Sequence, residues 1–219
     1  TGEDMISYCK REIVERYQLT KVSAVIAGGK ERYDSVYKGL LACEECKYVF
    51  IHDGARPFLD EEIIKRNIQA VREYQACVAG VQETGACVVG MPSKDTVKVA
   101  DEADFVSETP DRKRVWTVQT PQIFSYDLIR GAYESIRKKD MTGVTDDAMV
   151  VETYGNVPVK LFEGGYDNIK VTTPEDVRLA TNLVRVRKIF HKLHILHDKL
   201  IYMQMKAYKK RFKEKKQKK

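Results

Sequence analysis

Asp53 and Arg56 are the residues of this chain whose types and spacing most clearly suggest chemistry. They follow Tyr48–His52, a short run of mostly apolar, β-favouring residues that is typical of a buried parallel strand. In open α/β sheets, ligands bind outside the carboxyl ends of the strands. A carboxylate there suits a hard cation, and an arginine can hold a phosphate through two N–H donors. The pattern predicts a site for a metal-bound anion; the alternative is a strand-end turn with a surface ion pair.

A second stretch with binding character begins at Gly28 and Gly29, which follow an expected short strand at Val22–Ala27. Paired glycines after a strand allow the backbone to approach a ligand closely. Ser35 is placed to cap a helix over Val36–Leu41, and the N-terminus of that helix would favour an anion. The spacing matches neither a Walker A nor a Rossmann fingerprint, so this stretch alone indicates no specific ligand.

The elements that would position these residues alternate between strands and helices, which predicts an α/β domain with a largely parallel sheet flanked by helices. The remaining strands are expected at Ala86–Met91, Val157–Phe162 and Asn168–Val171. Helices are expected around Met5–Tyr17, after Asp60, from Ser125 to about Lys138, at Thr145–Asp147 and from Thr173 onward. A projecting β-arm is expected within residues 93–122, from Lys94–Ala100, Phe105–Glu108 and Val115–Gln119.

The composition indicates a folded protein without a membrane span. Of the 219 residues, 43% are hydrophobic and 32% are charged, which suffices for one large domain or two small ones. No apolar run reaches the roughly 18 residues that a spanning helix needs. The five cysteines, an odd number, favour reduced thiols and a cytoplasmic location. Cys43 and Cys46 form a lone CxxC without a second pair or a nearby histidine, so neither a zinc nor a redox role is expected.

The positive charge is concentrated at the end of the chain. Residues 185–219 hold 14 Lys or Arg and two acids, whereas residues 1–184 hold 24 basic and 30 acidic residues. The basic balance therefore belongs to the tail and says nothing about the partner of the globular part. We predict a domain over 1–184 and a basic helical tail over 185–219, helical to about Tyr208 and disordered at its end. Apolar residues spaced four and three apart support the helix: Ile189, Leu193, Leu196, Leu200, Met203 and Ala207.

Eight short motifs along the chain form an ordered set. They are Gly28–Arg32, Asp34–Val36, His52–Phe58, Lys94–Lys98, Thr109–Arg112, Trp116–Gln122, Thr145–Ala148 and Asp167–Thr172. In this order they resemble the 2-C-methyl-D-erythritol 4-phosphate cytidylyltransferases, the CTP-dependent enzymes of the non-mevalonate isoprenoid pathway. The resemblance runs from Thr1 to about Val184.

The resemblance implies a nucleotidyltransferase-like (Rossmann-like) fold, a homodimer formed through the β-arm, and Mg²⁺ as cofactor. The implied reaction is attack by the phosphate of methylerythritol phosphate on the α-phosphorus of CTP, with release of pyrophosphate. Transfers of this kind depend on positioning and on charge stabilisation by Mg²⁺, Lys and Arg.

The resemblance also implies roles for single residues. Gly29, Lys30, Ser35 and Asp53 would lie along the nucleotide, and Asp53 would also be the metal ligand. The residues expected around the sugar phosphate are Asp53, Arg56, Thr96, Arg112, Thr120, Thr145 and Lys170. Arg112 and Lys170 are the catalytic candidates, because they would orient the attacking phosphate. Arg112 lies on the arm and would serve the partner's site in a dimer.

Two features depart from the family pattern. The family's first segment is a strand and a glycine-rich loop whose basic residues hold the triphosphate, and nothing before Val22 supplies it. Residues 76–91 contain a near-repeat that looks like an insertion; its second copy is the expected strand, and its first copy extends a helix or forms a loop. We therefore expect this chain to be an incomplete form with little cytidylyltransferase activity alone.

Three other functions compete with this interpretation. A ribitol-5-phosphate cytidylyltransferase would share the fold and the chemistry, but Lys94–Lys98 and Thr109–Arg112 favour methylerythritol. A non-catalytic remnant would bind or dimerise without turning over CTP. Contact of the tail with nucleic acid or an anionic membrane is the alternative that we do not favour, because no nucleic-acid-binding motif is present.

Overall fold

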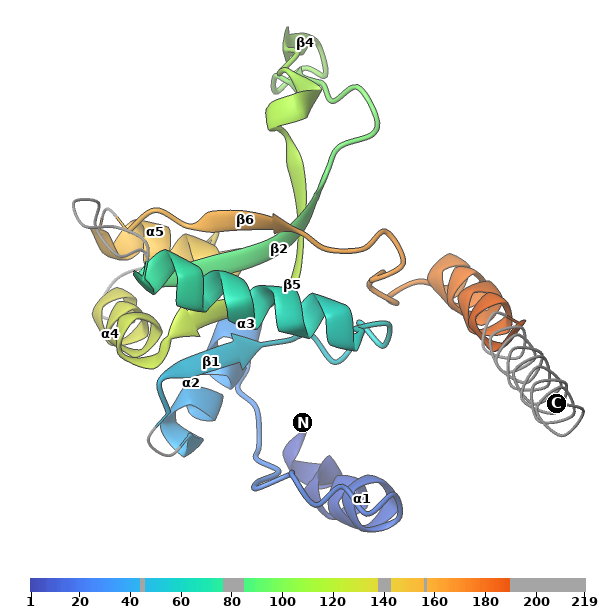
Figure 1. The fold of residues 1–219 in the computed structure, drawn as a ribbon. Helices are drawn as coiled ribbons and strands as arrows, with labels where there is room; N and C mark the ends of the chain where they lie inside the picture. Colours follow the sequence, from blue (N-terminus) through green and yellow to red (C-terminus); the bar gives the residue numbers. More distant parts are fainter. Residues whose placement is uncertain (44–45, 77–84, 138–142, 156, 190–219) are drawn as a thin grey trace, which may run out of the picture. The chain divides into compact units, whose positions relative to one another are not determined.

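The computed structural model describes residues 1–43, 46–76, 85–137, 143–155 and 157–189 (Figure 1). It forms two compact units, Thr1–Asn168 and Ile169–Lys219, which are described separately. The first unit carries the sheet and its helices, and the second carries a helix over residues 174–189.

The central sheet has four strands in the order β1-β5-β2-β6, from β1 (Tyr48–Ile51), β5 (Trp116–Ser125), β2 (Ala86–Pro92) and β6 (Lys160–Glu163). β5 pairs antiparallel with both β1 and β2, and β2 pairs parallel with β6. β1, β2 and β6 therefore run in one direction, and only β5 runs against them. The predicted α/β fold is confirmed, with a sheet that is mixed in its pairing because β5 returns from the arm.

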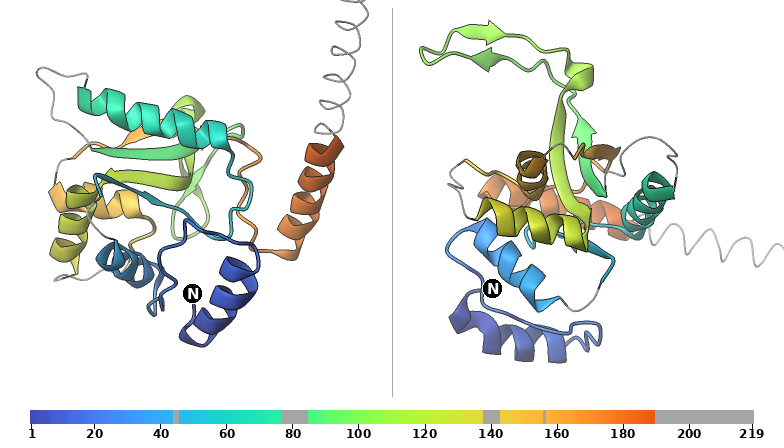
Figure 2. Two further views of the ribbon diagram at one scale, coloured as in Figure 1. Left: turned by 60° about the horizontal axis from the view of Figure 1, so that its bottom comes forward. Right: turned by 90° about the vertical axis from the view of Figure 1, so that its left-hand side faces the viewer.

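Helices cover both faces of the sheet (Figure 2). On one face lie α2 (Arg32–Ala42), α4 (Tyr126–Ile136) and α5 (Asp147–Gly155), and on the other lies α3 (Glu61–Ala76). Side chains alternate along a strand. The α2–α4–α5 side accordingly holds a core with one set of strand residues: Val49, Ala86, Val88 and Phe124, packed with Leu40, Ile129, Tyr133 and Val151. The alternate residues Cys87 and Ile123 form a second, smaller cluster.

The helix after the paired glycines begins earlier than predicted. α2 starts at Arg32, and Glu31 is its N-cap in a capping box with Asp34. Ser35 lies inside the first turn, where its hydroxyl donates to the Glu31 carbonyl and accepts from the Gly29 N–H. The predicted cap at Ser35 is therefore wrong, because Glu31 and Asp34 supply the capping interactions one turn earlier.

Two predicted strands are absent from the described sheet. Over Val22–Ala27 the segment pairs with no strand of the described residues; near its end, the Thr1 amine donates to the Ile26 carbonyl at 3.2 Å. Over Asn168–Val171 the chain follows a turn, in which the Asn168 N–H donates to the Gly165 carbonyl at 3.1 Å. An extended segment without a neighbouring strand has no ladder to join.

The other predicted elements are confirmed. The first helical segment runs through η1 (Glu3–Met5), α1 (Ile6–Cys9) and η2 (Lys10–Glu15), with a hydrogen-bond pattern that changes along its length. Asp60 caps α3 by accepting from the Ile63 N–H at 2.7 Å. The second copy of the near-repeat forms β2, and the first copy, apart from Ala76 at the end of α3, lies outside the described residues.

The arm is a hairpin that projects from the sheet (top of Figure 1). β3 (Val99–Ala100) pairs antiparallel with β4 (Val106–Glu108), and η3 (Arg112–Arg114) leads into β5. Every residue of β3 and β4 is exposed. The predicted β-arm is thus confirmed, and it presents two strands without cover within this chain's described residues.

In the second unit, the helix over residues 174–189 begins at a reciprocal cap. The Thr173 N–H donates to the Asp176 carboxylate at 2.8 Å, and the Asp176 N–H donates to the Thr173 hydroxyl at 3.2 Å. The helix start predicted from the Thr-Pro-Glu-Asp sequence is confirmed. This helix runs without a break past position 185, where the predicted tail begins, and the tail from residue 190 onward lies outside the described residues.

Candidate active site

Asp53 follows β1 at the edge of the sheet where β1, β2 and β6 all end. Its side chain is 14% exposed, and each of its two carboxylate oxygens faces an arginine. Oδ1 lies 3.2 Å from Arg32 Nε, and Oδ2 lies 3.8 Å from Arg56 Nε. The predicted pairing of Asp53 with Arg56 is therefore present, and a second base that was not predicted joins it.

Thr120 and His52 form a hydrogen-bonded chain next to Asp53. The backbone N–H of Asp53 donates to the Thr120 hydroxyl over 3.0 Å, and that hydroxyl lies 2.9 Å from His52 Nδ1. His52 Nε2 lies 3.0 Å from the Arg56 carbonyl oxygen, which can only accept. Nε2 therefore carries a proton, and in a neutral imidazole Nδ1 then accepts from Thr120. These hydrogen bonds link β5 to the loop after β1 and fix the backbone of Asp53.

Arg56 is held by backbone carbonyls as well as by Asp53. Its Nη1 donates to the Asn168 carbonyl at 2.8 Å and its Nη2 to the Val118 carbonyl at 3.5 Å. Nε is buried and makes no hydrogen bond within the described part of the chain. Burial lowers the pKa of Arg56, and the charge of Asp53 opposes that shift. The guanidinium stays protonated at neutral pH, so Arg56 is a fixed positive charge whose Nε faces the Asp53 carboxylate.

A buried ion pair lies on the other side of Arg32. Arg32 Nη2 donates to Asp147 Oδ2 at 2.8 Å, and the Tyr133 hydroxyl donates to Asp147 Oδ1 at 2.6 Å. The Asp147 and Tyr133 side chains are fully buried. Burial lowers the pKa of Arg32, but the hydrogen bonds and negative charges of Asp147 and Asp53 outweigh this effect, and the pKa is raised. Arg32 therefore bridges two carboxylates that lie 21 and 115 positions from it in the sequence.

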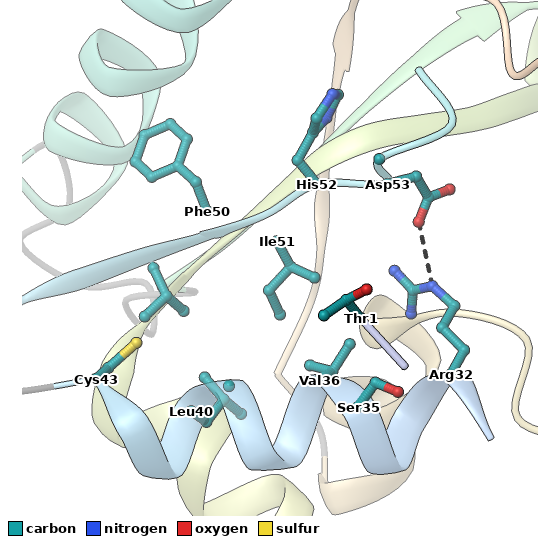
Figure 3. Close-up of a pocket in the computed structure, with 13 residues that line it drawn as sticks. Thr1, Arg32, Ser35, Val36, Leu40, Cys43, Phe50, Ile51, His52 and Asp53 are labelled. Atoms are coloured by element: carbon teal, nitrogen blue, oxygen red, sulfur yellow. Dashed lines mark hydrogen bonds and ion pairs between the residues drawn. The ribbon is translucent and has the colours of Figure 1, made fainter. Parts of the chain in front are cut away.

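A cavity of about 510 Å³ lies between β1 and α2 (Figure 3). Arg32 and Asp53 point toward one another in it, and Ser35 also faces it. The rest of its lining is largely apolar: Val36, Leu40, Val49, Phe50 and Ile51 among others. A polar end joined to an apolar wall suits a ligand with a charged part and a flat or apolar part.

The glycine stretch lies against the start of α2. The Gly29 N–H donates to the Ser35 hydroxyl at 2.9 Å. A Cβ on Gly29 would collide with the Asp34 side chain, so only glycine fits there. Lys30 is exposed on the loop. Of the residues predicted for the nucleotide, Ser35 and Asp53 therefore share one cavity, and Gly29 contacts Ser35.

The remaining predicted residues come from the arm, from the segment before α5 and from the second unit. Thr96 and Arg112 are exposed on the arm, where Arg112 Nη1 donates to the Lys94 carbonyl at 3.4 Å. Thr145 is exposed just before α5, and its hydroxyl contacts Met149 Sδ at 3.7 Å. Lys170 belongs to the second unit. The roles of these four residues stay predictions.

The cavity offers one carboxylate that could hold a metal ion together with the phosphates of a ligand. Among the described residues, no group of three or more His, Cys, Asp or Glu side chains could hold a metal. Mg²⁺ is commonly held by one or two carboxylates and by substrate phosphates, rather than by a cage of protein ligands. Asp53 supplies one such carboxylate at the cavity, whereas Asp147 is fully buried and engaged by Arg32 and Tyr133.

Several residues of this site had no assigned role in the sequence reasoning. Arg32, His52 and Asp147 stood inside motifs that were noted, but nothing in the spacing connects Arg32 to a residue 115 positions away. Tyr133 gave no signal, because a tyrosine on the apolar face of a helix is usually core. Its hydroxyl becomes meaningful only once Asp147 is seen beside it.

Comparison with known proteins identifies the family of this chain. The profile of the 2-C-methyl-D-erythritol 4-phosphate cytidylyltransferase family matches residues 5–186. Proteins of that name from Lachnospira eligens and Alkaliphilus oremlandii are 48% and 44% identical to the chain over 181 and 188 residues. These alignments cover 82% and 85% of the chain, and 75% of each relative.

Solved structures give the same result. The 4-diphosphocytidyl-2C-methyl-D-erythritol synthase of Anaerococcus prevotii superposes with a TM-score of 0.73 at 33% identity, covering 84% of this chain and 76% of that one. The 2-C-methyl-D-erythritol 4-phosphate cytidylyltransferase of Thermus thermophilus superposes with a TM-score of 0.61 at 32% identity, covering 73% and 72%.

Proposed function

The chain belongs to the 2-C-methyl-D-erythritol 4-phosphate cytidylyltransferase family, and we propose on that premise that it takes CTP and 2-C-methyl-D-erythritol 4-phosphate as its substrates. A phosphate oxygen of the sugar phosphate attacks the α-phosphorus of CTP. The bond from that phosphorus to the bridging oxygen breaks, and pyrophosphate leaves with the electron pair. The product is the CDP-linked methylerythritol, a precursor in isoprenoid biosynthesis.

The observation that carries this proposal is the arrangement of charged residues around Asp53. A carboxylate held between Arg32 and Arg56 lies at the carboxyl end of β1, beside a cavity whose wall is α2. Phosphoryl-type transfer needs fixed charges and little covalent chemistry. A rigid set of one acid and two bases supplies fixed charges, and the adjoining cavity offers space for a nucleoside.

We assign the predicted residues to two groups in this reaction. Gly29, Lys30 and Ser35 lie along the nucleotide, with Asp53 between nucleotide and sugar phosphate. The contact of Gly29 with Ser35 and the position of Ser35 in the cavity support the first group. The second group surrounds the sugar phosphate and consists of Arg56, Thr96, Arg112, Thr120, Thr145 and Lys170. In it, Arg112 and Lys170 orient the attacking phosphate.

Magnesium is the proposed metal, held by Asp53 and by the phosphates of CTP. When bound, it would neutralise charge that develops on the phosphate oxygens. The protein's own contribution is the position of the carboxylate, which Arg32 and Arg56 hold from its two oxygens.

We further propose a homodimer that forms through the arm. Phe105 is 73% exposed and Val106 is 60% exposed at the hairpin, and Val99 is 44% exposed on β3. Apolar side chains on a two-stranded ribbon need cover from another surface. In such a dimer we expect Arg112, which lies on the arm, to serve the partner's site.

We also propose a cytoplasmic location. The cysteines of the described residues, Cys9, Cys43, Cys46 and Cys87, are free, which supports a reducing compartment. Among the helices of the described ranges, none is long and apolar enough to cross a membrane.

The test is release of pyrophosphate by this chain when it is preceded by the strand and glycine-rich loop that the family pattern has first, with CTP, Mg²⁺ and each of two sugar phosphates. Methylerythritol 4-phosphate should support turnover, at about 1 s⁻¹ or faster for an ordinary enzyme, and ribitol 5-phosphate should not. Asp53→Asn should remove most of the activity. Turnover that prefers ribitol 5-phosphate, or that survives Asp53→Asn unchanged, would overturn the proposal.

A further inference from the structure

Asp147 is a buried acid for which the reaction proposed above has no role. It has 0% exposure, and both of its oxygens have partners: Tyr133 on Oδ1 and Arg32 on Oδ2. Tyr133 also has 0% exposure. Neither residue lines the cavity beside Asp53. We therefore do not expect Asp147 or Tyr133 to contact a ligand in that cavity directly.

The energetics of this cluster indicate a positioning role. Burying a charged carboxylate away from solvent costs folding free energy unless the carboxylate is paired with a positive charge and hydrogen-bonded. Asp147 receives a charge-assisted bond from Arg32 and a short bond from the Tyr133 hydroxyl. Burial, and next the negative charge of Asp147, raise the pKa of Tyr133, so the phenol keeps its proton and acts only as a donor. Both oxygens of the acid are thus fixed.

The contacts continue from this cluster into the site. The Tyr133 hydroxyl comes from α4, Asp147 from the first residue of α5, and Arg32 from the first residue of α2. Arg32 spans the remaining gap, with Nη2 on Asp147 and Nε on Asp53. Because the guanidinium is planar and rigid, fixing one end of it fixes the direction of the other.

We propose that Asp147 and Tyr133 are positioning residues, which act through Arg32 to orient the Asp53 carboxylate. This inference rests on the proposed role of Asp53 in binding the metal–nucleotide substrate. Loss of the Asp147 charge would leave Arg32 free to turn toward Asp53 alone or into the cavity. In either case the Asp53 oxygens would no longer present the same geometry to a cation.

The experiment combines binding with kinetics in the same protein that is used for the activity test above. The variants are Asp147→Asn, which keeps the shape of the side chain, and Tyr133→Phe, which removes one hydroxyl. Calorimetric titration with Mg²⁺–CTP, without the second substrate, gives an affinity that does not depend on turnover. Pyrophosphate release at varied Mg²⁺ gives the metal concentration for half-maximal rate. The melting temperature tests whether each variant is folded.

Tyr126→Phe is the matched control. Tyr126 lies on the same helix α4, and its hydroxyl is also hydrogen-bonded: it donates to the Leu40 carbonyl at 3.0 Å and accepts from Arg130 at 2.9 Å. Its described hydrogen bonds involve neither Asp147 nor Arg32. This control separates loss of a tyrosine hydroxyl in general from loss of the one that holds Asp147.

We expect Asp147→Asn to weaken Mg²⁺–CTP binding and kcat/KM by about 10- to 100-fold, and to raise the half-maximal Mg²⁺ concentration, while Tyr133→Phe gives about 3- to 10-fold. Tyr126→Phe should change neither quantity. If Asp147→Asn does not fold, Tyr133→Phe alone decides. Folded variants that bind Mg²⁺–CTP like the wild type would overturn the inference.

A double-mutant cycle separates this inference from the role of Asp53 itself. If Asp147 acts through Asp53, Asp147→Asn should add little to the effect of Asp53→Asn. Full additivity of the two effects would overturn the positioning role. If Asp53→Asn alone changes neither binding nor rate, the proposed role of Asp53 fails instead, and with it the premise of the inference.

Discussion

Replacing Thr120 with valine should destabilise the fold much more than the same replacement at a surface threonine. Thr120 is 4% exposed, and its hydroxyl accepts from the Asp53 N–H and lies 2.9 Å from His52 Nδ1. Valine has nearly the same shape but offers neither bond. A buried polar group left unsatisfied costs about 1–3 kcal/mol. With two partners affected, we expect about 2–4 kcal/mol of lost stability in total.

Thermal unfolding followed by circular dichroism measures this loss. For a protein of this length, about 1 kcal/mol shifts the melting temperature by about 2–4 °C, so Thr120→Val should lower it by on the order of 10 °C. Thr120→Ser keeps the hydroxyl and loses one methyl group, at about 0.8 kcal/mol. It should therefore retain most of the stability.

Thr117→Val is the control on the same strand. Thr117 is exposed, and its hydroxyl makes one bond, to the Met91 carbonyl at 3.1 Å. Solvent can replace that bond, so the expected change is within about 0.5 kcal/mol. Equal melting temperatures for Thr117→Val and Thr120→Val would refute the reasoning. It would mean that the hydroxyl of Thr120 does not hold the Asp53 backbone.

Three further predictions concern the arm, the second unit and the reaction. Arg112→Ala and Lys170→Ala should each lower kcat/KM for the sugar phosphate by about 10²- to 10³-fold, through loss of a charge-assisted contact to a dianion. Mixed dimers of the two should regain one intact site if Arg112 acts in trans, and activity within a few-fold of wild type would exclude a residue from this role. Phe105→Ser should shift the protein toward monomer in analytical ultracentrifugation, because it removes the most exposed apolar side chain of the arm; an unchanged dimer would contradict the arm interface. Hydrogen bonds from the backbone N–H groups of Thr172 and Thr173 lower the pKa of Asp176. Its contribution to the helix start should therefore be present above the unfolded pKa of about 3.9 and be lost as pH falls through the lower folded value. A carboxyl titration by NMR that gives the ordinary pKa would contradict this cap.

The sequence was sufficient to predict those parts of the site that local pattern determines. An apolar run that ends in Asp53 and Arg56 marks a strand end, and the structure has β1 end there with the two side chains facing each other. The near-repeat and the arm were likewise predictable, because strand period and turn residues are local signals. The start of the second unit's helix followed from its cap and proline alone.

The failures of prediction were failures to foresee long-range partners. Val22–Ala27 has the composition of a strand, but a strand exists only when a neighbour pairs with it, and here the Ile26 carbonyl bonds to Thr1. Serine is a residue type that often caps helices, but at the start of α2 Glu31 and Asp34 already form the capping hydrogen bonds. In both cases a local preference was correct in kind, and a competing hydrogen bond decided the outcome.

The same reason explains why the contacts that orient Asp53 could not be predicted. Its two oxygens and its N–H are held by Arg32, Arg56 and Thr120, of which only Arg56 is near in sequence. Thr120 lies 67 positions away, and the acid behind Arg32 lies 115 positions from it. A charge near the end of a strand can be predicted from neighbours, but its orientation depends on groups that only the fold brings together. The precision that phosphoryl transfer requires therefore arises from distant residues, and testing Asp147 and Thr120 tests that dependence directly.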